Sequence, residues 1–138
     1  MQLSLENKVA LVTGGSRGIG RAIALGLAKS GADVVIASRK IGDLENVAGE
    51  IKSLGRKCLP VATHIGRLEE IKNLVDKAAA EFGRIDILVN NAGTNPTMVP
   101  AMDIDDRAWD SIMNLNLKGL FFLSQAVARI MKEKGGGR

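Results

Sequence analysis

Closely spaced glycines between an apolar run and an amphipathic stretch are the residues of this sequence best suited to chemistry. Residues 13–20 read Thr-Gly-Gly-Ser-Arg-Gly-Ile-Gly and directly follow the apolar run 9–12. Glycines permit a tight turn and a close approach of the backbone to a ligand, and the first amides of a following helix point at anions. The spacing Gly14-x-x-x-Gly18-x-Gly20 therefore predicts a site for the pyrophosphate of a dinucleotide.

A second polar motif, Asn90-Asn91-Ala92-Gly93, follows another short apolar run, residues 85–89. Ligands of open parallel sheets bind outside the carboxyl ends of the strands, at the point where the strand order reverses. The first and fourth strands of a doubly wound sheet are neighbours across that point. We therefore expect both motifs to border the same crevice.

The elements that position these motifs alternate along the chain. Strands are expected at 8–13, 33–38, 57–63 and 85–90, and helices at 19–30, 42–54, 68–82 and about 105–134. Pro60 places the third strand at an edge, because proline cannot donate to the sheet. The alternation predicts an α/β fold with right-handed crossovers, namely a Rossmann-type, doubly wound parallel sheet with the strand order 3-2-1-4.

The composition fits one domain spanning residues 1–138, with 46% hydrophobic and 25% charged residues. The single Cys58 and single His64 exclude an internal disulfide and a Cys/His metal cluster, and we expect no metal. Scattered basic residues and 3% aromatic residues argue against nucleic acid. No apolar run approaches the roughly 18 residues that cross a bilayer. These features predict a cytoplasmic protein that binds an anionic small molecule, and no membrane partner.

Together with Asn116 in the segment Met113-Asn-Leu-Asn-Leu-Lys-Gly119, the two motifs resemble the short-chain dehydrogenase/reductase family. The resemblance implies a nicotinamide cofactor and an Asn116 that belongs to a catalytic tetrad, kinks its helix and holds a water in a proton relay. Without the resemblance, Asn116 would be interpreted as a solvated polar residue of a helix. The resemblance makes Asn91 a structural residue and implies cofactor contacts at Gly14, Ser16, Arg17, Gly18, Ile19, Gly20, Asn90, Ala92 and Gly93.

The end of the second strand bears on which nicotinamide cofactor binds. An acidic residue there binds the ribose 2′-hydroxyl of NAD, but this chain reads Ala37-Ser38-Arg39-Lys40. Ser38 can donate a hydrogen bond to a 2′-phosphate. The planar guanidinium group of Arg39 can bind the phosphate with two hydrogen bonds, and Arg17 can reach the same region. We therefore predict NADP(H) in preference to NAD(H). The alternative, that both arginines are simply solvated, stays open.

The adenine side of the predicted site departs from the family. The resemblance implies an aspartate just after the third strand, and His64 of Thr63-His64-Ile65 takes that position. A neutral histidine can still accept one hydrogen bond, so His64 and Ile65 are candidates for contact with adenine. A histidine that simply faces solvent is the alternative.

The sequence lacks the proton donor that the resemblance implies. Hydride transfer to a carbonyl leaves an alkoxide, which the family protonates with a tyrosine whose pKa is lowered by a lysine four residues later, while a serine polarises the carbonyl. This chain contains no tyrosine, and the resemblance places these residues beyond a fifth strand. We therefore expect residues 1–138 to be the N-terminal part of a longer enzyme, inactive alone, with an exposed apolar edge at 85–89. The tail 135–138 is either a frayed helix end or, as we favour, a loop that leads to a further strand.

The predicted function is an NADP(H)-dependent oxidoreductase that interconverts an alcohol and a ketone on a small-molecule substrate. The 3-oxoacyl reductases, sugar dehydrogenases and carbonyl reductases all fit the resemblance. A non-catalytic nucleotide-binding module and an inactive fragment are the alternatives. Residues 105–134 carry more apolar side chains than one sheet face needs, and the resemblance implies a homo-oligomer, dimer or tetramer, formed through this helix.

Overall fold

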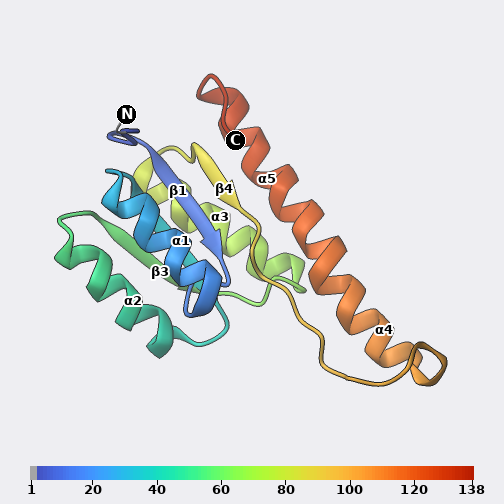
Figure 1. Cartoon of the computed structure of the whole chain (residues 1–138). Coiled ribbons are helices and arrows are strands. Elements are labelled where there is room, and N and C mark those ends of the chain that lie inside the picture. The colour runs from blue at the N-terminus through green and yellow to red at the C-terminus, as the bar shows by residue number, and fades with distance from the viewer. Residues whose placement is uncertain (1–2) are drawn as a thin grey trace.

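A four-stranded parallel sheet forms the centre of the computed structural model, which describes residues 3–138 (Figure 1). Its strands are β1 (Val9–Thr13), β2 (Asp33–Ser38), β3 (Cys58–Ala62) and β4 (Ile87–Val89). They lie in the order β3-β2-β1-β4, and each neighbouring pair is parallel. The predicted fold class and strand order are therefore confirmed, as is the edge position of the strand that contains Pro60.

Helices cover both faces of the sheet because its strands bury side chains alternately on either side. Leu11 and Val35 join the core formed with α3 (Leu68–Phe82) and α5 (Leu120–Glu133). Val12 and Ile36, one residue further along, join the core formed with α1 (Gly18–Lys29) and α2 (Ile41–Ser53). Figure 1 shows the resulting three layers. Because both faces are covered, the strands read in sequence as continuous apolar runs.

The predicted helix 105–134 is a rod of three segments. It begins with α4 (Asp106–Met113), whose N-terminus is capped by Asp105 through a 2.7 Å hydrogen bond from the Ala108 N–H. A π-helical turn, η2 (Asn114–Gly119), follows and leads into α5. Leu123 and Val127 anchor α5 in the core, whereas α4 has no buried residue and projects beyond the sheet (Figure 1).

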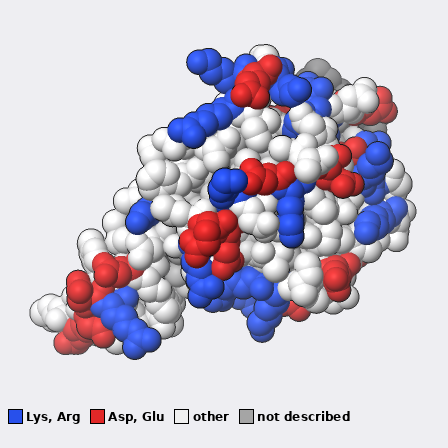
Figure 2. Space-filling model, turned by 180° about the vertical axis from the view of Figure 1, so that it is seen from behind, with Lys and Arg blue, Asp and Glu red and all other residues white. Residues whose placement is uncertain are grey.

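The loop that precedes the rod contains a short 3₁₀ turn, Ala101–Asp103. Seen from behind, the projecting end carries charged side chains of both signs, and charges of both signs are interspersed over the rest of that face (Figure 2). None of the helices in residues 3–138 combines the length and the apolar character needed to cross a membrane.

The edge at β4 is less exposed than expected. Arg138 lies beside it, because the Leu88 N–H donates to the Arg138 carbonyl (2.8 Å) and the Arg138 N–H donates to the Asp86 carbonyl (2.9 Å). Gly135 and Gly136 turn the chain back after α5 with φ values of 92° and 129°. Ile85 is fully buried and β4 is half-buried, so the expectation of a bare apolar edge is wrong for this segment.

Candidate functional site

The turn between β1 and α1 has the geometry of an anion-binding loop. Gly14 and Gly18 adopt the left-handed region, with φ values of 64° and 55°. A Cβ on Gly20 would overlap the Gly14 carbonyl oxygen, so only glycine allows the helix to start this close to the turn. Arg17 precedes α1 and makes no side-chain capping bond. The first amides of α1 are therefore free to bind a ligand.

The two sequence motifs are joined at Thr13, which is buried at the end of β1. Its hydroxyl oxygen accepts hydrogen bonds from the Asn91 N–H (3.1 Å) and the Ala92 N–H (3.0 Å). The Asn91 side-chain amide donates to the carbonyls of Thr13 (3.1 Å) and Gly14 (3.2 Å). These bonds fix the glycine turn against the chain that leaves β4.

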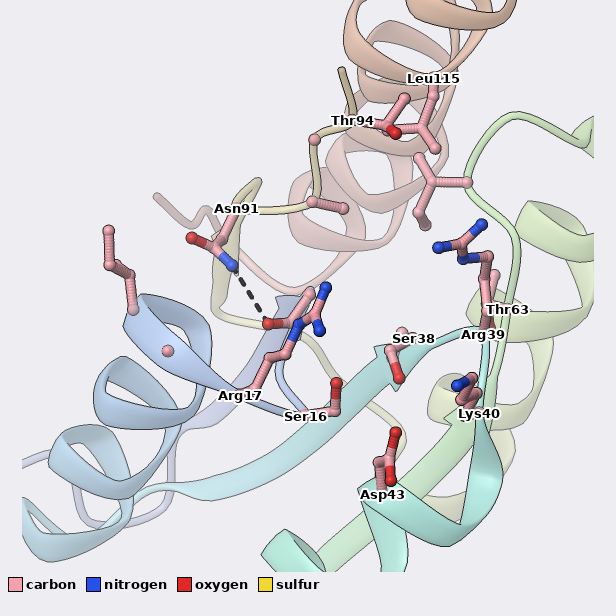
Figure 3. A pocket seen from close by; sticks show the side chains of 17 residues that line it. Ser16, Arg17, Ser38, Arg39, Lys40, Asp43, Thr63, Asn91, Thr94 and Leu115 are labelled. Atoms are coloured by element: carbon pink, nitrogen blue, oxygen red, sulfur yellow. Dashed lines mark hydrogen bonds between the residues drawn. The ribbon is translucent and has the colours of Figure 1, made fainter. Parts of the chain in front are cut away.

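A cavity of about 550 Å³ opens at the carboxyl ends of the strands (Figure 3). Ten of the residues that the sequence assigns to cofactor binding line it: Gly14, Ser16, Arg17, Gly18, Ile19, Ser38, Arg39, Ile65, Ala92 and Gly93. The rest of the wall comes from residues that the sequence reasoning did not assign: Ala37, Lys40, Asp43, Thr63, Asn91, Thr94 and Leu115.

Three assigned residues do not line this cavity. Gly20 lies beneath the turn, against the Gly14 carbonyl. The Asn90 side-chain amide donates to the Ser124 hydroxyl (3.0 Å), which ties the end of β4 to α5. His64 is engaged within its own turn, where its Nδ1 accepts the Gly66 N–H (3.0 Å).

The end of β2 presents cationic and hydroxyl groups to the cavity. In Figure 3, Arg17 and Arg39 approach from two sides of the opening, and Ser38 lies between them. The Ser38 carbonyl accepts the Thr63 N–H (2.7 Å), whereas its buried hydroxyl has no hydrogen-bond partner within residues 3–138. A buried polar atom without a partner is costly, so this hydroxyl fits a ligand that carries an acceptor.

The turn between β3 and α3 lines the cavity next to the end of β2, through Thr63 and Ile65, and is held by hydrogen bonds. The His64 N–H donates to the Glu70 carboxylate (2.6 Å), which also accepts from Arg67 (2.9 Å). The pKa of Glu70 is lowered, chiefly by the hydrogen bond from His64 and further by Arg67. A Cβ on Gly119 would overlap the Ile65 carbonyl oxygen, so η2 packs directly against this turn.

Asn116 uses its whole side-chain amide to hold the loop that follows β4. Its Oδ1 accepts the Thr94 N–H (2.8 Å), and its Nδ2 donates to the Thr94 carbonyl (2.8 Å). The interpretation of Asn116 as a solvated residue is therefore wrong. The helix departs from α-helical geometry at this residue, which lies within η2.

Among the residues that sequence reasoning did not assign, Lys40 and Asp43 carry charge. Lys40 directly follows Arg39 and Asp43 is the third residue of α2, and helix starts at the carboxyl end of a sheet face the ligand crevice. That position is the signal that could have identified them. Asn91 contributes to the wall as well as to the bonds that hold the turn.

The family model and the relatives found by comparison with known proteins agree with one another. Residues 8–138 match the family model for short chain dehydrogenase. The chain is 42% identical over 134 residues to 2-dehydro-3-deoxy-D-gluconate 5-dehydrogenase of Escherichia coli (strain K12). That alignment covers 97% of this chain and 52% of the relative, so the chain spans about half the length of the curated relatives it matches.

Solved structures agree with the fold. L-Sorbose reductase from Gluconobacter frateurii, in complex with NADPH and L-sorbose, superimposes with a TM-score of 0.94 at 35% identity, covering 99% of this chain and 52% of that one. The 3-ketoacyl-(acyl-carrier-protein) reductase from Brucella melitensis, in complex with NADH, gives a TM-score of 0.89 at 38% identity, covering 96% of this chain and 53% of that one.

Proposed function

Because the chain belongs to the short-chain dehydrogenase family, we propose that it is the cofactor-binding part of an NADP(H)-dependent oxidoreductase acting on an alcohol or ketone. The observation that carries the cofactor choice is the buried, unpartnered Ser38 hydroxyl in the same cavity wall as Arg17 and Arg39. A 2′-phosphate offers acceptor oxygens to all three side chains.

The residues of the cavity fit a dinucleotide in the family's orientation. The free amides at the start of α1, from Gly18 to Gly20, would bind the pyrophosphate. Gly93 and Thr94 would border the nicotinamide side, and Thr63 and Ile65 the adenine side. The bound nicotinamide would supply or accept the hydride.

The choice between the two cofactors must lie in this chain's own residues, because the sorbose reductase binds NADPH and the ketoacyl reductase binds NADH. No acidic residue follows β2 before Asp43. A hydrogen bond to a charged group contributes about 1.5–3 kcal/mol, so one net contact with the phosphate is worth about 10- to 100-fold in affinity.

We assign Asn116 the part of a positioning residue. By fixing Thr94 it holds the loop that leaves the cavity on the side away from the 2′-phosphate site. The general acid implied by the family is a tyrosine, and the sequence contains none. We therefore propose that these 138 residues bind the cofactor without turning over a substrate.

Oligomerisation is part of the same proposal. Several large apolar side chains of the α4–α5 rod are exposed, among them Trp109 (53%) and Phe121 (57%). An exposed apolar patch of this kind is typical of a subunit interface. We propose that the protein forms a homo-oligomer through the rod.

Titration with the two reduced cofactors tests the cofactor choice. We expect NADPH to bind at least 10-fold more tightly than NADH, measured by isothermal titration calorimetry. Arg39→Asp should abolish or reverse this preference, because it replaces the guanidinium group by a carboxylate that accepts a hydrogen bond from the 2′-hydroxyl. Lys77→Asp makes the same change of charge on the exposed side of α3, outside the cavity, and should leave the ratio unchanged. Equal or tighter binding of NADH by the unsubstituted chain would overturn the proposal.

A further inference from the structure

An acidic side chain lies in the part of the cavity that we assign to the 2′-phosphate. Asp43 is the only acidic residue among those that line the cavity within residues 3–138. We propose that Asp43 is a specificity-determining residue that weakens NADP(H) binding by like-charge repulsion and so limits the discrimination between NADP(H) and NAD(H). This inference rests on the proposed function, because it requires a 2′-phosphate beside Ser38 and Arg39.

The position of Asp43 follows from the start of α2. Lys40 precedes the helix and makes no side-chain capping bond, and Asp43 is the third residue of the helix. In Figure 3 the Asp43 carboxylate points toward the end of β2, where Ser38 lies, and Lys40 is beside it. The phosphate and this carboxylate would therefore share one end of the cavity.

Asp43 is not neutralised by a neighbour. Within residues 3–138 its carboxylate is exposed and takes part in no hydrogen bond and no ion pair. Glu50 of the same helix differs in this respect, since it pairs with Arg21. The cations of the cavity wall, Arg17, Arg39 and Lys40, are thus opposed by one free negative charge.

Helix stability gives a reason for an acid at this position. A carboxylate in the first turn interacts favourably with the positive end of the helix dipole. A bound 2′-phosphate carries about two negative charges and would occupy the same positive potential. The ribose of NAD(H) carries only a neutral hydroxyl there, so the repulsion falls on NADP(H) alone.

The decisive experiment compares Asp43→Asn with the unsubstituted chain by calorimetric titration with NADPH and with NADH at low ionic strength. We expect NADPH to bind about 3- to 10-fold more tightly to the variant, the size of a solvent-exposed interaction between like charges. Binding of NADH should change less than twofold. The gain for NADPH should shrink in 0.5 M salt, because salt screens exposed charges.

Glu45→Gln is the matched control, because Glu45 is an exposed acid of the same helix that does not line the cavity. It removes the same charge and should leave both affinities unchanged. Asp43→Ser serves as a second variant, because it removes the same charge with a different small polar side chain. Far-ultraviolet circular dichroism of both variants can be checked against that of the parent.

The outcomes separate this inference from the proposed function. An unchanged ratio of the two affinities in both Asp43 variants, or a ratio changed only because NADH binds more weakly, would overturn the repulsion while leaving the NADP(H) assignment intact. Failure of the unsubstituted chain to bind NADPH, or to prefer it over NADH, would overturn both.

Discussion

Asp86 accepts more hydrogen bonds than any other acidic side chain in the core of residues 3–138. Its carboxylate accepts the Val9 N–H (2.9 Å) and two hydrogen bonds from the Arg84 guanidinium (2.8 and 2.6 Å), and Lys8 lies 3.9 Å away. Burial acts to raise the pKa of Asp86, but the hydrogen bonds from Arg84 and Val9 and the positive charges outweigh it, so the pKa is lowered. This carboxylate fixes the start of β1 beside the segment that enters β4.

Asp86→Asn should lower the free energy of unfolding by about 2 kcal/mol at pH 7, because a charge-assisted hydrogen-bond network loses its charge. The folded-state pKa lies below the unfolded value of 3.8, so the carboxylate stabilises the fold above about pH 4 and loses that effect as the pH falls through the folded-state pKa. Urea unfolding of both proteins at pH 7 and at pH 3 measures the difference, which should shrink in acid.

Asp76→Asn provides the comparison for that measurement. Asp76 pairs with Lys72 on the surface of α3, where ion pairs contribute little. Its substitution should barely move the unfolding midpoint at either pH. A difference for Asp86→Asn that stays constant from pH 7 to pH 3 would contradict the charge-based explanation.

Residue types and spacing predicted much of the candidate site, but not the partners of its side chains. The glycine turn and the end of β2 were identifiable because their chemistry depends on sequence-local geometry. The contact that Asn116 makes was not identifiable, because its partner Thr94 is 22 residues away and no local sequence pattern indicates such a contact. The engagement of His64 with Gly66 is local, yet it depends on a rotamer that the sequence does not specify.

At the scale of elements, the start of α1 depends on the absence of a side chain at one position. Gly20 and Gly26 lie in the same helix, but a Cβ on Gly20 would overlap backbone whereas one on Gly26 meets nothing within 4 Å. The two glycines therefore separate the effect of close approach from that of helix propensity.

Gly20→Ala should destabilise the protein and abolish NADPH binding, because the helix must move away from the Gly14 carbonyl. Gly26→Ala should instead raise the free energy of unfolding by about 0.5–1 kcal/mol and leave binding intact, since alanine favours the helix. Thermal unfolding and cofactor titration of both variants check this. Equal stability of the two variants would show that the turn can relax around an added methyl group.

The elements themselves were largely predictable, since the apolar runs coincide with the strands and the glycines after each apolar pattern lie at the helix ends. The exception is the helix expected at 105–134. Its apolar residues suit one continuous α-helix, and η2 interrupts that helix because Gly119 packs against Ile65 and Asn116 binds Thr94. Both causes are tertiary contacts, which periodicity does not contain.

The whole molecule combines a core closed on both faces with a rod that extends beyond it. Buried side chains of α5 hold the rod to the sheet, while Trp109, Leu117 and Phe121 remain more than half exposed. The rings of Phe121 and Phe122 pack edge to face, with their centroids 5.3 Å apart. The proposed subunit contact would cover this apolar surface.

Phe121→Arg should convert the proposed oligomer of the 14.6 kDa chain into monomers, because a charge buried in an apolar interface without a partner is costly. Sedimentation equilibrium measures the mass, and circular dichroism verifies that the fold is retained. Leu54→Arg makes the same kind of change at an exposed leucine after α2, far from the rod in sequence, and should leave the mass unchanged. A parent chain that is monomeric at micromolar concentration would contradict the proposed contact.

The extra residue accommodated in η2 has a consequence for how this part of the gene can vary. A π turn contains one residue more than an α turn, so removing one codon between 114 and 119 would close η2 into an α turn and leave the following helix in its present register. Leu123 and Val127 would still face the sheet, whereas removing a codon between 120 and 122 would rotate both by about 100°. A change of one residue in length is therefore tolerated within this hexapeptide better than in the regular helix that follows.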